Sequence, residues 1–144
     1  MSQRQEPVTI VMIEDDDGHA RLIEKNVRRA GVCNAILHLR DGTSALARLL
    51  EPEFAASPLL VLLDLNLPDM SGTDILARLK SHDRLRLVPV IVLTTTDDRH
   101  EVQRCYDLGC NVYITKPVDY DAFAQAIRQL GLFLSVMQVP EAAT

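Results

Sequence analysis

The segment VLLDLNLPDMSG, residues 61–72, decides how the rest of the chain is interpreted. A run of Leu and Val ends abruptly in Asp64, and Asn66 and a Pro-Asp turn follow it. A short continuous apolar run is typical of a strand that is buried on both faces, as in a parallel sheet. The chemistry of the segment therefore depends on which side chains lie beside the carboxylate that ends the strand.

Similar apolar runs recur along the chain and alternate with segments of helical periodicity. Strands are expected at 8–13, 34–39, 58–63, 88–94 and 111–115. Helices are expected after each strand, in segments that end near Gly31, cover 43–50, 73–80 and 98–108, and begin near Tyr120. This alternation predicts a doubly wound α/β domain, with one five-stranded parallel sheet and helices on both faces. The polar side chains of His38 and Arg40 place the second strand at an edge.

The length of 144 residues predicts one domain, over residues 8–130, with a tail at 1–7 and a C-terminal helix extension and tail at 131–144. The net charge of −5 and the scattered arginines argue against binding to nucleic acid. No apolar run is long enough to span a bilayer, so no membrane partner is expected. Three cysteines without metal-ligand spacing predict a reduced, cytoplasmic setting.

Polar side chains follow the strands at their carboxyl ends, where doubly wound sheets bind ligands. Glu14 and Asp15 follow the first strand, Asp64 the third, Thr94 the fourth and Lys116 the fifth. Clustered carboxylates favour Mg²⁺, which prefers oxygen ligands. Asp64 could then act as a nucleophile that forms an aspartyl-phosphate. The metal would bind one phosphoryl oxygen, the Lys116 ammonium a second and the Thr94 hydroxyl a third, which would offset the negative charge of the phosphoryl group.

Each of these residues alone has an ordinary structural explanation. An Asp after a strand commonly caps a helix or forms a turn, and Asp16 or Asp17 can serve as the cap of the first helix. Thr94 and its neighbours fit a strand end, and a Lys-Pro pair is a weak signal. Their joint occurrence at four strand ends favours a phosphoryl-transfer site.

Four segments together resemble the response-regulator receiver domain of two-component signalling. They are VMIEDD, VLLDLNLPDMSG, VPVIVLTTTDD and NVYITKPVD, and the resemblance covers about residues 8–130. It implies a flavodoxin-like strand order 2-1-3-4-5. It also implies a phosphoacceptor, Asp64, that takes a phosphoryl group from a sensor histidine kinase with Mg²⁺ or Mn²⁺ bound. The resemblance assigns further roles as follows: metal binding to Glu14, Asp15, Asp64 and the backbone carbonyl of Asn66; phosphoryl binding to Thr94 and Lys116; conformational switching to Thr94 and Tyr113; a cis peptide to Lys116–Pro117.

Only 28 residues follow Lys116, too few for a DNA-binding effector domain. The chain is therefore expected to be a stand-alone receiver that signals by protein–protein contacts and catalyses only its own phosphorylation and dephosphorylation. The LTTT segment and the C-terminal extension resemble single-domain regulators that partner bacterial phytochromes. A phosphate shuttle or sink between kinases is an alternative. A Mg²⁺-dependent phosphatase of the haloacid-dehalogenase type is disfavoured, because residue 66 is Asn where that family needs a second Asp.

The last helix carries one apolar stripe that is expected to face the sheet. Further apolar side chains lie off this stripe and predict an interface. We expect a homodimer through the face formed by the helix at 98–108, the strand at 111–115 and the last helix, extended by residues 131–139. The side chains assigned to this interface are Leu132, Phe133, Val136 and Val139. The four histidines and three cysteines are not expected to belong to a site.

Overall fold

The computed structural model describes residues 7–95, 98–116 and 120–129. Its centre is a five-stranded sheet with the order β2-β1-β3-β4-β5, in which every neighbouring pair is parallel. The predicted fold class and strand order are confirmed, and the second strand lies at an edge as expected. The strands are β1 (Thr9–Ile13), β2 (Ile36–Leu39), β3 (Leu59–Asp64), β4 (Val90–Thr94) and β5 (Val112–Thr115).

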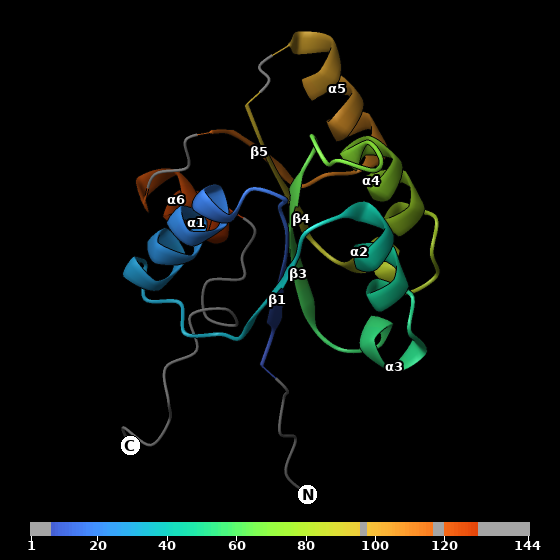
Figure 1. Cartoon of the computed structure of the whole chain (residues 1–144), viewed down its shortest axis with the longest axis horizontal. Helices are drawn as coiled ribbons and strands as arrows, with labels where there is room; N and C mark the ends of the chain where they lie inside the picture. The colour runs from blue at the N-terminus through green and yellow to red at the C-terminus, as the bar shows by residue number, and fades with distance from the viewer. Residues whose placement is uncertain (1–6, 96–97, 117–119, 130–144) are drawn as a thin grey trace, which may run out of the picture.

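Helices cover both faces of the sheet, as Figure 1 shows. On one face lie α1 (Asp17–Arg29) and α6 (Tyr120–Gln129), which contact each other. On the other face lie α2 (Gly42–Leu49), α3 (Pro52–Ala55), α4 (Gly72–Lys80) and α5 (Arg99–Leu108). A 3-10 turn, η1 (Leu85–Leu87), precedes β4.

The central strand β3 separates two hydrophobic clusters. All six of its residues are buried, which is why it contains Leu and Val at every position before Asp64. Leu60 and Leu62 pack in the cluster with α1 and α6, whereas Val61 and Leu63 pack in the cluster with α2, α4 and α5. Burial on both sides fixes the position of the strand, and therefore the position of the carboxylate at its end.

Three of the differences between the structure and the sequence-based expectation involve Asn34, Pro89 and a short helix. The second strand begins at Ile36 rather than at Asn34, whose side chain donates a hydrogen bond to the Val8 carbonyl, 2.8 Å away. Pro89 precedes β4, and its carbonyl accepts from the Val61 amide at 3.0 Å. The short helix α3 was not expected, and it begins with a proline at a position where the missing N–H costs nothing.

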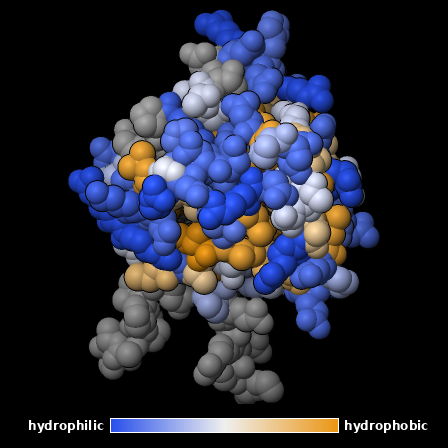
Figure 2. Space-filling view, viewed as in Figure 1, coloured by the Kyte–Doolittle hydropathy of each residue, from blue (hydrophilic) through white to orange (hydrophobic). Residues whose placement is uncertain are grey.

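The surface is largely hydrophilic in the view of Figure 2, and a prominent apolar area lies between the two helix layers. The edge strand β2 lies there, and its four residues are only half-buried. None of the helices in the described part of the chain has the length and apolar character that crossing a bilayer requires.

Candidate functional site

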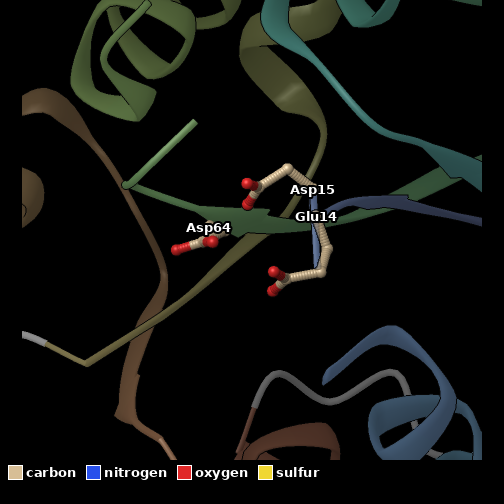
Figure 3. A group of neighbouring side chains, drawn as sticks. All are labelled: Glu14, Asp15 and Asp64. Atoms are coloured by element: carbon tan, nitrogen blue, oxygen red, sulfur yellow. The ribbon is translucent and has the colours of Figure 1, made fainter. Parts of the chain in front are cut away.

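The three expected carboxylates come together at the carboxyl edge of the sheet. β1 ends at Ile13, so Glu14 and Asp15 leave its end beside Asp64, the last residue of the neighbouring strand β3. One oxygen from each residue lies within 4.8 Å of the other two. Figure 3 shows the three carboxylates pointing to the same side of these strand ends. Glu14 and Asp64 are buried, whereas Asp15 is exposed to solvent.

Lys116 places a positive charge between two of these carboxylates. Its Nζ lies 2.5 Å from Glu14 Oε1 and 3.4 Å from Asp64 Oδ2, and its side chain is nearly buried. The residue is held at the end of β5 by its amide, which donates to the Thr94 carbonyl at 2.8 Å. The ammonium therefore partly offsets the repulsion between the two buried acids.

The electrostatic balance at Glu14 remains unfavourable for its charged form. Burial raises the pKa of Glu14, the hydrogen bond from Lys116 lowers it, and the neighbouring charge of Asp64 raises it again. The net effect is a raised pKa. The single positive charge of Lys116 does not neutralise three carboxylates. The site therefore fits a divalent cation, and its oxygen ligands suit Mg²⁺ or Mn²⁺.

Asn66 links the acceptor to the end of the next strand. Its amide donates to Asp64 Oδ1 at 3.1 Å, and its Nδ2 donates to Thr94 Oγ1 at 3.3 Å. Thr94 is fully buried as the last residue of β4. One residue thus links Asp64, through its backbone amide, to the Thr94 hydroxyl that was expected to bind a phosphoryl oxygen, through its side chain.

The loop after Asp64, residues 65–72, is closed on itself. The Gly72 amide donates to the Leu65 carbonyl at 2.9 Å, and Asn66 pairs with Ser71 in an isolated antiparallel bridge. A side chain at Gly72 has no room, because its Cβ would lie 2.6 Å from both the Asp64 carbonyl oxygen and the Leu65 Cα. An open depression of about 560 Å³ lies over this loop and is bordered by Asp15 and Glu101.

His19 is the residue that the sequence interpretation missed. Its Nδ1 lies 3.4 Å from Lys116 Nζ and 3.9 Å from Glu14 Oε2, so the imidazole borders the site. Asp16 holds it there by capping α1, since Asp16 Oδ1 accepts from the His19 amide at 2.9 Å. The capping role considered for Asp16 is thus observed. No spacing motif in the sequence signals the proximity of His19 to Lys116.

The remaining predicted residues lie at the margin of the site or beyond the described part of the chain. Tyr113, on β5, is half-buried and packs against the cluster that contains α2 and α4. Pro117, and with it the predicted cis peptide, falls outside the described residues. The predicted interface residues also fall outside them: Leu132, Phe133, Val136 and Val139.

Fold and site together define a doubly wound α/β domain with carboxylates, a lysine and a hydroxyl at the carboxyl ends of its strands. The family model of the response regulator receiver domain matches residues 10–128. The chain therefore belongs to the response regulator receiver family.

Similar proteins include single-domain response regulators. A crystal structure of a receiver domain from Rhodospirillum rubrum is 65% identical with a TM-score of 0.75, over 93% of this chain and 98% of that one. Response regulator Rcp1 of Synechocystis is 37% identical over 76% of this chain and 77% of its own, and a Mn²⁺-bound form of Rcp1 has been solved. The bacteriophytochrome response regulator RtBRR is 35% identical with a TM-score of 0.80, over 94% of this chain and 84% of that one.

Proposed function

We propose that Asp64 accepts a phosphoryl group from the phosphohistidine of a sensor histidine kinase. The observation that carries this proposal is the position of Asp64, which lies within reach of two carboxylates and of the Lys116 ammonium at the open edge of the sheet. An Asp64 carboxylate oxygen would attack phosphorus, and the bond from phosphorus to the imidazole nitrogen of the donor would break. The donor histidine, protonated on its other ring nitrogen, then takes the electron pair of the broken bond and leaves as a neutral imidazole, and the phosphoryl group stays on Asp64 as an acyl phosphate.

We propose Mg²⁺, or Mn²⁺, as the cofactor of this reaction. Asp15, Asp64, Glu14 and the backbone carbonyl of Asn66 are the proposed ligands. The support is the carboxylate cluster, together with the Mn²⁺-bound form of the related Rcp1. Since Glu14 is paired with Lys116, the exposed Asp15 is the more direct ligand of the acidic pair. When bound, the cation supplies the positive charge that lets the acids and a phosphoryl group share the site.

The residues around the acceptor have distinct proposed tasks. Lys116 would bind one phosphoryl oxygen, and to do so it must release part of its contact with Glu14. Thr94 would bind another oxygen through its hydroxyl, which now accepts from Asn66. Movement of Thr94 would change the space available to Tyr113, which lies on the adjacent strand β5. This pair is the proposed switch that carries the phosphorylation state to the surface.

The proposed output is contact with other proteins rather than with DNA. A bacteriophytochrome kinase is the proposed phosphodonor, supported by the likeness to RtBRR. We propose a homodimer through the face of α5, β5 and α6, extended by residues 131–139, and a cytoplasmic setting in which the free cysteines stay reduced. Sedimentation of the protein at micromolar concentration, with and without phosphorylation, tests the dimer, and a monomer in both states contradicts it.

Intact-mass spectra test the proposed reaction. Wild type and Asp64→Asn are incubated with a small acyl phosphate, with and without Mg²⁺. We expect one phosphoryl adduct on wild type only, and only with the metal. An adduct on both proteins would place the acceptor elsewhere, and an adduct without metal would remove the cofactor from the proposal. Turnover of an added phosphomonoester would instead favour the phosphatase alternative.

A further inference from the structure

Asp69 connects the loop after Asp64, residues 65–72 and hereafter the acceptor loop, to the helix α2. Its Oδ1 accepts from the Gly42 amide at 2.8 Å. Its Oδ2 accepts from the Thr43 amide at 2.8 Å and from Thr43 Oγ1 at 2.6 Å. One exposed side chain in the middle of the loop 65–72 thus makes three hydrogen bonds to the first turn of α2.

The contact is more than a helix cap, because α2 has its own cap. Asp41, the residue before the helix, accepts from the Ser44 amide at 2.6 Å and from the Ser44 hydroxyl at 3.2 Å. The first amides of a helix lack partners within it. Here Asp41 satisfies one of them locally, and Asp69 satisfies the two before it from 26 and 27 residues away.

A second contact keeps the loop against α2. The side chain of Met70 covers Gly42 so closely that a Cβ there would lie 2.3 Å from Met70 Cγ. Gly42 itself is buried. The absence of a side chain at Gly42 therefore lets the loop approach α2 closely enough for Asp69 to reach the two amides.

The acceptor loop also carries Asn66, which contacts two residues of the proposed phosphoryl site. Asn66 contacts Asp64 and Thr94, and its bridge to Ser71 connects the two ends of the loop. Asp69 lies between Asn66 and Ser71 in the sequence. Fixing Asp69 on α2 therefore restricts the conformations that are available to Asn66.

We propose that Asp69 is a positioning residue, which holds the acceptor loop on the N-terminus of α2 and so holds Asn66 in place for the cation and the phosphoryl group. This inference rests on the proposed function, since it concerns the same site. Through the same contact, the first turn of α2 would respond to what is bound beside Asp64. Coupling between two sites is reciprocal, so a cation bound beside Asp64 strengthens the contact between Asp69 and Thr43.

The test compares Asp69→Ala with Asp41→Ala. Both variants remove a carboxylate from the N-terminus of α2, but only Asp69 belongs to the acceptor loop. Mg²⁺ affinity is measured by calorimetry, and amide hydrogen exchange at Gly72 and Asn66 is measured in the metal-free protein. We expect Asp69→Ala to weaken Mg²⁺ binding roughly five-fold or more and to accelerate exchange at both amides. Asp41→Ala leaves both quantities near the wild-type values.

A second pair of variants tests one hydrogen bond of the same link from the side of the helix. Thr43→Val deletes the hydroxyl that donates to Asp69, and Thr43→Ser keeps it. We expect Thr43→Val to shift Mg²⁺ affinity in the same direction as Asp69→Ala, with little added effect in the double variant, while Thr43→Ser behaves as wild type. This pair decides the question if Asp69→Ala does not fold.

The outcomes separate this inference from the proposed function. If wild type binds no Mg²⁺ and takes no phosphoryl group, the proposed function fails. If wild type does both, and the Asp69 and Asp41 variants change affinity and exchange equally, then Asp69 is only a helix cap and the inference is overturned.

Discussion

Lys116 Nζ lies 2.5 Å from Glu14 Oε1 and 3.4 Å from Asp64 Oδ2, so one ammonium is shared by two buried carboxylates that belong to different strand ends. The lysine stands 102 residues from Glu14 in the sequence. This contact offsets part of the charge that a divalent cation would neutralise. A bound metal and the lysine would therefore act on the same acids, and we expect that removing one changes the effect of the other.

Lys116→Met tests this relationship. The substitution keeps a long side chain and removes the charge, so the buried acids lose their partner, and breaking a buried ion pair costs about 3–5 kcal/mol. We expect a lower midpoint of thermal unfolding without metal, and a larger Mg²⁺-induced increase of that midpoint than in wild type. Lys25→Met, on the exposed face of α1, is the matched control. An equal Mg²⁺-induced increase in all three proteins would show that the lysine and the metal do not share the acids.

Gly72→Ala tests the close packing of the acceptor loop. The added Cβ would lie 2.6 Å from two backbone atoms, so the loop must shift. We expect a loss of about 1–3 kcal/mol in the free energy of unfolding and weaker Mg²⁺ binding. Gly18→Ala is the control in the first turn of α1, where the added Cβ would lie 3.1 Å from a side-chain oxygen of Asp16. Urea unfolding and calorimetry give the two quantities, and wild-type values for Gly72→Ala would contradict the packing argument.

The stability that Asp69 contributes should depend on pH. The Thr43 hydroxyl and the amides of Gly42 and Thr43 lower the pKa of Asp69 to about 2. A lowered pKa in the folded state gives stability that is present above the unfolded pKa and is lost as the pH falls through the folded one. The difference in unfolding free energy between wild type and Asp69→Asn should be constant above about pH 5 and shrink below about pH 4. A difference that grows on acidification would contradict the assignment of these bonds to the ionised carboxylate.

The three cysteines should differ sharply in their reactivity. Burial raises the pKa of Cys110 to about 12 and also raises the pKa of Cys105, whereas Cys33 is exposed. The thiolate is the reactive form, so a thiol of pKa 12 has roughly a thousand-fold less of it than an ordinary cysteine at neutral pH. We expect one thiol per chain to react fast with a soluble disulfide reagent in the native protein, and this reaction to be lost in Cys33→Ser. After denaturation of the wild type, the two other thiols should react as well. Fast reaction of a second thiol in the native protein would show that this part of the core opens.

The sequence predicts the sheet well because burial dictates composition there. β3 is buried along its whole length, and only an apolar run fits that environment. The meeting of Glu14, Asp15 and Asp64 follows from parallel strands alone, since all their carboxyl ends lie at one edge. These parts of the prediction needed no knowledge of side-chain contacts.

Other features depend on contacts that the sequence does not announce. Asp69 reads as a residue of a Pro-Asp turn, and its bonds to Gly42 and Thr43 arise only when the loop folds over α2. His19 is similar, because an exposed residue in the first turn of a helix carries no sign that Lys116 lies 3.4 Å away. Such details become visible only when distant segments are placed side by side.

The central claim is that Asp64 itself carries the phosphoryl group, and chemical trapping tests it most directly. Wild-type protein is phosphorylated with a small acyl phosphate and Mg²⁺ and reduced with borodeuteride, which converts an aspartyl phosphate to deuterated homoserine. The products are then mapped by peptide mass spectrometry. Our account predicts deuterated homoserine at position 64 and at no other carboxylate. A reduced residue at Glu14, Asp15 or Asp69, with Asp64 intact, would contradict it.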